Sequence, residues 1–157
     1  MLGALLRVGE QLLREAGVPD AHIWTFTTPY ADEVDKAVRE GICTALRLPN
    51  GPTAIFAGGY YLALSAMQTA HQAGLRIPDD VSVLGFDDPP SAALASPPLT
   101  TFRQPLDQLG ARAVQKLLGC AKGVRPDPLH EYLPIELIVR ESTAPPTPAA
   151  HVPAQSP

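Results

Sequence analysis

Apolar positions along the chain follow two patterns, one typical of amphipathic helices and one typical of short buried strands. Apolar residues at 5–16 recur at helical spacing, and Gly17 before Val18-Pro19 is a stop signal, so a first helix is predicted there. Residues 22–26 are β-branched and aromatic, which predicts a strand. Residues 27–29, Thr-Thr-Pro, then offer a cap and a first-turn proline, so a second helix is predicted to run to about Leu46.

The same alternation continues through the rest of the chain. A wholly apolar strand is predicted at 54–57, and Gly58-Gly59 turns the chain into a helix from 61 to 73. Strands are predicted next at 81–86, 100–103 and 131–139, with a helix opened by Pro105 before the last of them. Helices that alternate with short apolar strands predict a three-layer, doubly wound and mainly parallel α/β sheet, covered on both faces.

In such sheets, ligands bind beyond the carboxyl ends of the strands. The segments at that edge are 27–30, 58–61 and 87–88. Only the last offers carboxylates, which accept hydrogen bonds from the hydroxyls of a small polar ligand. A second interpretation stays equally open, because Asp87 or Asp88 can also cap the turn before Pro89.

Composition and charge narrow the functional classes. The chain has 157 residues with 45% hydrophobic content and a net charge of −4, and its scattered Lys and Arg residues form no basic stripe that could grip DNA. Cys43 and Cys120 lie far apart, and the four histidines show no metal-ligand spacing, so no metal site is expected. No export signal, membrane span, nucleophile elbow or phosphate loop is visible. A cytoplasmic protein that is not an enzyme and needs no cofactor is therefore expected.

Three long motifs carry a resemblance to a known family. They are PTAIFA at 52–57, GLRIPDDVSVLGFDD at 74–88 and PLTTFRQP at 98–105, and the match continues through 109–113 and 134–143. These residues resemble the LacI/GalR transcriptional repressors, whose effector-binding domain has a periplasmic-binding-protein-like fold of two lobes. The resemblance implies that residues 1–143 form the C-terminal effector-binding and dimerisation lobe. The proline-rich tail, 144–157, is expected to be disordered.

The resemblance also implies site residues. Asp87 would contact effector hydroxyls, together with Gly59, Tyr60, Tyr30 and Leu106. Where the family often has Asn-Asp, this chain has Gly59-Tyr60, which removes one polar side chain from the expected pocket. Tyr60 could stack on a sugar face, although an aromatic residue at a helix start more often packs internally. The residues expected in a homodimer interface are Tyr61, Leu64, Phe102 and Gln104.

The expected function follows from these assignments. The chain would sense a sugar or related small molecule and dimerise, and operator DNA would be bound only through an N-terminal helix-turn-helix headpiece that these residues do not contain. With one lobe alone, effector binding is expected to be weak or absent. Two alternatives are a sugar-binding protein of a transport system and a standalone half-domain that forms heterodimers with full-length repressors.

Overall fold

The computed structural model describes residues 2–20, 25, 34–48, 51–125, 128 and 130–145, and residues 2–8 and 34–38 as backbone only. Within them, four strands form one sheet in the order β1-β2-β3-β4. They are β1 (Ala54–Phe56), β2 (Ser82–Phe86), β3 (Thr100–Arg103) and β4 (Glu136–Ile138). The first three strands run parallel, and β4 is antiparallel to β3. The expected mainly parallel α/β fold is confirmed.

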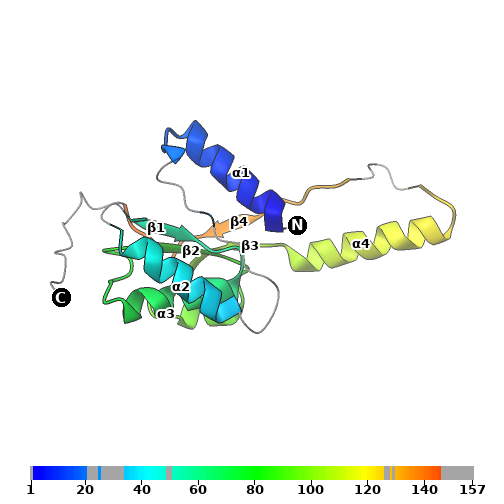
Figure 1. Cartoon of the computed structure of the whole chain (residues 1–157). Coiled ribbons are helices and arrows are strands. Elements are labelled where there is room, and N and C mark those ends of the chain that lie inside the picture. The colour runs from blue at the N-terminus through cyan, green and yellow to red at the C-terminus, as the bar shows by residue number, and fades with distance from the viewer. Residues whose placement is uncertain are drawn as a thin grey trace.

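Five helical elements accompany the sheet in the described residues. They are α1 (Leu2–Glu15), α2 (Val34–Leu46), α3 (Tyr60–Gln72), the short 3-10 helix η2 (Pro90–Leu94) and α4 (Leu106–Ala121). Figure 1 shows α2 and α3 beneath the sheet and α1 on its other side. The predicted helices therefore form, and each boundary that the structure describes lies within a few residues of the predicted one.

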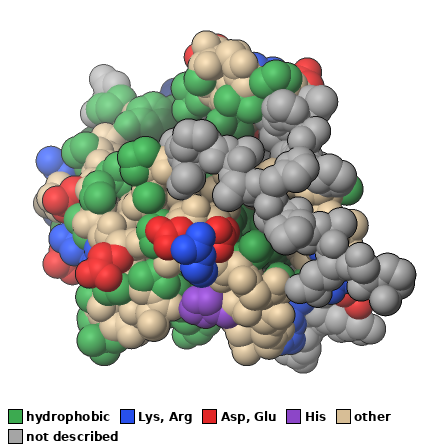
Figure 2. All heavy atoms as spheres, turned by 90° about the vertical axis from the view of Figure 1, so that its left-hand side faces the viewer, with side chains coloured by type: hydrophobic (Ala, Val, Ile, Leu, Met, Phe, Trp, Pro, Cys, Tyr) green, Lys and Arg blue, Asp and Glu red, His purple; other side chains and the backbone are tan. Residues whose placement is uncertain are grey.

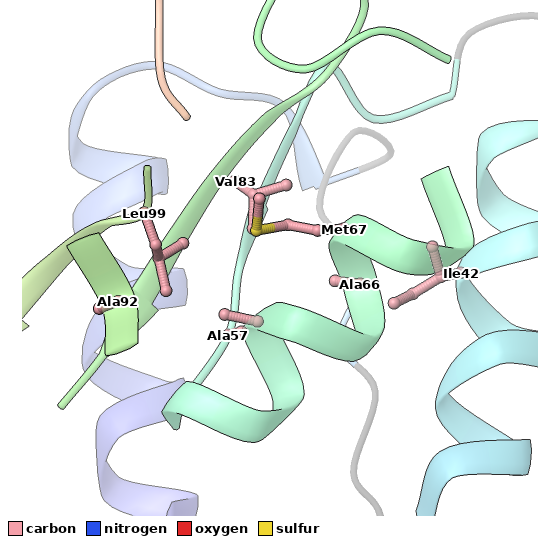
Figure 3. Packing of buried hydrophobic residues seen from close by; sticks show 8 residues of the cluster. Ile42, Ala57, Ala66, Met67, Val83, Ala92 and Leu99 are labelled. Carbon is pink, nitrogen blue, oxygen red and sulfur yellow. The ribbon is translucent and has the colours of Figure 1, made fainter. Parts of the chain in front are cut away.

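The hydrophobic core lies between the sheet and the helices α2 and α3. Figure 3 shows Met67 of α3 pointing toward Val83, Ile42 of α2 lying toward α3 near Ala66, and Leu99 beside Ala92. Alanines of α3 that are almost fully buried let the helix lie close to β2. Gly85 of β2 is part of this close packing, because a Cβ atom there would stand 2.9 Å from Leu99 Cδ2.

Buried hydrogen bonds, here called the polar seam, join Ser142 to Val83 of β2 and Thr100 of β3. Ser142 is fully buried, and its hydroxyl donates to the Val83 carbonyl at 2.6 Å and accepts from the Thr100 amide at 2.8 Å. The Val83 amide in turn donates to the Ser142 carbonyl at 2.8 Å. Since every polar group of this seam finds a partner, its burial is compatible with a stable core.

The turn that precedes β2 is held by Arg76 and Asp80. The Arg76 guanidinium contacts both carboxylate oxygens of Asp80, at 2.8 and 2.9 Å, and the Arg76 amide donates to the same carboxylate at 2.8 Å. These hydrogen bonds from Arg76 hold the pKa of Asp80 below its ordinary value. The Arg-Ile-Pro-Asp-Asp sequence therefore builds the turn rather than a binding site.

The last strand is shorter than predicted. The alternation at 131–139 predicts a strand throughout, yet only Glu136–Ile138 pair with β3. Glu131 lies instead beside α4, with its carboxylate oxygens 3.4 Å from Arg112 and 3.4 Å from Lys116. Pro134 has no amide proton to donate to a ladder, so pairing begins only after it.

Helix α4 does not cover the sheet, contrary to the prediction of a covering layer. Figure 1 shows it running away from the strands, and none of its residues is buried. Its apolar side chains stay about half or more exposed: Leu106, Leu109, Val114, Leu117 and Leu118. The sequence pattern correctly predicts an amphipathic helix, but a pattern does not specify which surface the apolar face contacts.

Several predictions fall outside the described residues. These are the strand at 22–26, of which only Thr25 is described, the ligand segment at 27–30 with Tyr30, and the tail from 146 onward.

Candidate functional site

The carboxyl ends of β1 and β2 place two predicted segments at one edge of the sheet. Gly59 and Tyr60 follow β1, and Asp87 follows β2. Because β1 and β2 are parallel neighbours in register, with Ile55 opposite Val83, both strands end on the same side. This is the edge where open α/β sheets bind ligands.

Asp87 is held in an unusual conformation at this edge. Its φ of 73° lies in the left-handed region, which costs a residue other than glycine about 1 kcal/mol or more. The Thr101 hydroxyl donates to the Asp87 carbonyl at 2.8 Å, and Gln104 Nε2 donates to Asp87 Oδ1 at 2.6 Å. Within the part of the chain that the structure describes, Oδ2 of this exposed carboxylate has no hydrogen-bond partner.

The neighbouring Asp88 has the opposite environment. Its side chain is 3% exposed, and Oδ2 accepts hydrogen bonds from Arg103 Nε at 2.9 Å and Nη2 at 2.6 Å. Oδ1 lies 2.8 Å from Arg140 Nη1, an ion-pair contact that lacks the alignment of a hydrogen bond. Burial alone would raise the pKa of Asp88, but the two guanidinium groups outweigh it and hold the pKa below its ordinary value.

Aromatic side chains line the sheet face next to Asp87. The Phe102 ring lies 6.3 Å from that of Phe56 and 6.1 Å from that of Phe86, measured between centroids. Tyr60 packs partly against the core and contacts Tyr61 edge to face at 5.4 Å. The edge therefore combines an open carboxylate with half-buried aromatic surface, a combination suited to a small polar molecule with an apolar face.

The other predicted binding residues take different positions. Leu106 begins α4 and is 65% exposed, with its amide bonded to the Gln104 carbonyl at 2.9 Å. Of the residues expected in a dimer interface, Gln104 donates to Asp87, and Phe102 packs beside Phe86. Tyr61 is 82% exposed at the start of α3.

Leu64 lines a shallow groove whose lining does not include Asp87. This open groove lies between α3 and the segment that follows η2, and its lining includes Leu64, Met67, His71, Ala95 and Ser96. Met67 contributes to the core, whereas His71 is exposed. The groove therefore combines apolar floor with polar rim, which is the usual composition of a protein-protein contact.

The described residues do not gather groups for metal binding. No cluster of three or more His, Cys, Asp or Glu side chains occurs among them. On the face in Figure 2, acidic and basic side chains are interspersed rather than sorted by sign. No helix of the described residues is long and apolar enough to span a membrane.

Comparison with known proteins identifies the family. The family described as "periplasmic binding protein-like domain" matches residues 5–143. The HTH-type transcriptional regulator DegA of Bacillus subtilis is 38% identical over 135 residues, which cover 86% of this chain and 39% of DegA. A LacI family transcriptional regulator from Bifidobacterium animalis subsp. lactis superposes with a TM-score of 0.75 at 28% identity, over 88% of this chain and 48% of that one. The chain belongs to the LacI family.

A further LacI-family structure bears on the ligand. The regulator from Arthrobacter sp. FB24, solved in complex with lactose, is 32% identical to this chain with a TM-score of 0.62, over 73% of this chain and 44% of that one. The chain thus spans about two fifths of the length of DegA and less than half of each of these LacI-family structures. The relatives are transcriptional regulators, and the fold is that of their effector-binding domain.

Sequence reasoning missed the network beneath Asp87. Arg103 and Arg140 carry no motif that pairs them with Asp88, because the three residues meet only through the pairing of β3 with β2 and β4. The sequence gives one relevant signal, which is the adjacency of two aspartates at a strand end. It leaves open which carboxylate is buried, and the structure places Asp88 in that role.

Proposed function

We propose that this chain forms one wall of the effector site of a LacI-family transcriptional regulator, and that the effector is a sugar or a similar polyhydroxylated molecule. The observation that carries the proposal is the Asp87 carboxylate, which Gln104 fixes at the carboxyl edge of the sheet and whose Oδ2 has no hydrogen-bond partner among the described residues. An ionised carboxylate accepts hydrogen bonds from ligand hydroxyls, and such charge-assisted bonds are stronger than neutral ones.

The surroundings of Asp87 support a sugar over a charged ligand. Gln104 gives one amide hydrogen to Asp87 and retains an amide oxygen that can accept from a second hydroxyl. The phenylalanine cluster next to it offers a flat apolar face of the kind that sugar rings contact. Lactose bound to the Arthrobacter relative is consistent with this chemistry.

We infer that binding by this chain alone is weak, because a cleft between two lobes has lost one wall when a single lobe is present. The uncovered apolar face of α4 supports this inference, since a helix with that pattern normally packs against other structure. In a longer chain that carries a helix-turn-helix, an effector that favours one closure of the lobes would change operator affinity. A contact of this chain itself with DNA is not part of the proposal.

A sugar titration followed by NMR tests the binding proposal. The ¹⁵N-labelled chain would be titrated to millimolar concentrations with lactose, galactose, glucose and ribose. Amide shifts are expected to centre on Gly59, Tyr60, Asp87 and Leu106, and Asp87→Asn should weaken them. Asp79→Asn, an exposed carboxylate paired with Arg76 at 3.2 Å, is the matched control. Absence of specific shifts with every sugar would refute the proposal, and micromolar affinity would refute the inference of an incomplete site.

We further propose that the chain dimerises through α3 and the adjacent groove, with Tyr61 and Leu64 at the contact. The exposure of Tyr61 and the apolar floor of the groove support this surface. Sedimentation velocity of the chain and of a Tyr61→Asp/Leu64→Asp variant tests it: the variant should sediment as a monomer at concentrations where the parent is dimeric. An unchanged dimer would place the interface elsewhere. Mixing with a full-length relative would test the heterodimer alternative.

A further inference from the structure

Two adjacent aspartates pair with two adjacent residues of the neighbouring strand. Asp87 accepts from Gln104, and Asp88 accepts from Arg103. We call Asp87 with Gln104 the outer pair and Asp88 with Arg103 the inner pair. The outer pair is exposed toward the predicted ligand, and the Asp88 side chain of the inner pair is buried.

The inner pair is anchored more firmly than the outer one. Arg140, from the segment after β4, approaches the second oxygen of Asp88 to 2.8 Å. The Arg140 guanidinium also donates to the Leu99 carbonyl at 2.6 Å, and its amide donates to the Thr100 hydroxyl at 2.9 Å. The carboxylate of Asp88 is therefore tied to both ends of β3 at once, through Arg103 and through Arg140.

The left-handed backbone of Asp87 requires such an anchor. A residue other than glycine keeps a positive φ only where the surrounding contacts enforce it. One such contact is the hydrogen bond that the Thr101 hydroxyl donates to the Asp87 carbonyl. The residue that follows Asp87 in the chain is Asp88, whose side chain is anchored by the two arginines. With residue 88 fixed beneath β3, the backbone must reverse at 87, and this reversal directs the Asp87 side chain to Gln104.

We propose that Asp88, held by Arg103 and Arg140, is the positioning residue of the effector site: it sets the backbone of Asp87 and thereby the orientation of the carboxylate offered to the ligand. This inference rests on the proposed function only for the identity of the ligand, because the positioning itself is a property of the free chain. A purely structural role for Asp88 would change stability and leave the geometry of Asp87 as it is.

NMR couplings separate these two roles. The φ angle of Asp87 would be obtained from its three-bond HN–Hα and one-bond Cα–Hα couplings, and the Gln104 side-chain amide signal would report its bond to Asp87. Asp88→Asn and Arg103→Gln would be compared with the parent, with Asp79→Asn as control. We expect both test variants to lose the positive φ and the shifted Gln104 signal while most other amide shifts persist, and the control to keep both features.

The sugar titration adds the functional readout. For any sugar that binds the parent chain, Asp88→Asn should lower the affinity by roughly tenfold, by analogy with residues that orient metal ligands, whose loss costs about 10- to 100-fold in affinity. If Asp88→Asn does not fold, Arg103→Gln decides, since the Arg103 side chain is half exposed. Unchanged couplings and an unchanged Gln104 signal in the folded variants would overturn the proposal. A parent chain that binds no sugar would refute the proposed function, while the couplings would still decide the positioning role.

Discussion

Gly85 offers a sharp test of how tightly the sheet packs against α3. A Cβ atom at this position would stand 2.9 Å from Leu99 Cδ2, 3.3 Å from Ala63 Cβ and 3.3 Å from Thr101 Oγ1. All three neighbours are buried, so none can swing into solvent to make room. Gly85→Ala is therefore expected to strain the core although it adds a single methyl group.

The magnitude follows from two opposing contributions. Overpacking a closed core costs about 1–3 kcal/mol, and removing a glycine from the unfolded chain returns about 0.5 kcal/mol. The net loss in the free energy of unfolding should be about 0.5–2.5 kcal/mol, which lowers the melting temperature of a domain of this size by about 1–10 °C. Urea denaturation followed by circular dichroism measures the first value, and a thermal scan measures the second.

Gly110 provides a matched control for the same substitution. It lies within α4, and a Cβ there meets no atom within 4 Å. Gly110→Ala should increase helix content, since alanine is favoured over glycine in a helix interior by about 1 kcal/mol. The variant Gly85→Ala/Leu99→Val should lose less stability than the sum of its single changes, because valine is smaller than leucine and leaves room for the added methyl group. A Gly85→Ala protein as stable as the parent would refute the packing argument.

Three further predictions follow from other contacts. Ser142→Ala should cost about 2–3 kcal/mol in urea unfolding because it leaves two buried main-chain groups unpaired, whereas the exposed Ser91→Ala should change little. The folded-state pKa of Asp88 is depressed, so its stabilising ion pairs are complete above the ordinary carboxyl value of about 3.9 and are lost as the pH falls through the folded-state pKa. The stability difference between the parent and Asp88→Asn should thus be constant from neutral pH to about pH 5 and shrink at lower pH; a difference that persists unchanged at pH 2 would contradict this. Leu117→Glu, at a side chain 69% exposed, should alter unfolding by less than about 0.5 kcal/mol while reducing binding of a hydrophobic dye, and a large stability loss would show that α4 packs against the lobe.

The sequence predicts elements well where local chemistry defines them. Proline at the start of α4 and glycine after α3 give bounds within a few residues of those observed. It also places Asp87 correctly at a strand end, because the order of parallel strands fixes which ends share an edge. These are properties of segments shorter than about twenty residues.

Features that depend on distant partners could not be predicted in this way. The burial of Asp88 depends on arginines 15 and 52 positions away along the sequence, and the position of Glu131 beside α4 depends on its ion pairs with Arg112 and Lys116. The exposure of α4 is a third case, since an amphipathic pattern predicts that one helix face is apolar but does not specify which surface that face contacts. In each case the deciding term is a tertiary contact rather than a local preference.

The paired aspartates make the length of β3 matter more than its composition. Arg103 and Gln104 reach Asp88 and Asp87 from consecutive positions, so inserting or deleting one residue in β3 would shift both side chains out of register with their aspartates. Substitution at 104, by contrast, leaves the inner pair intact. A substitution at 104 would therefore change only the residue that contacts Asp87, whereas a change in the length of β3 would displace both pairs at once.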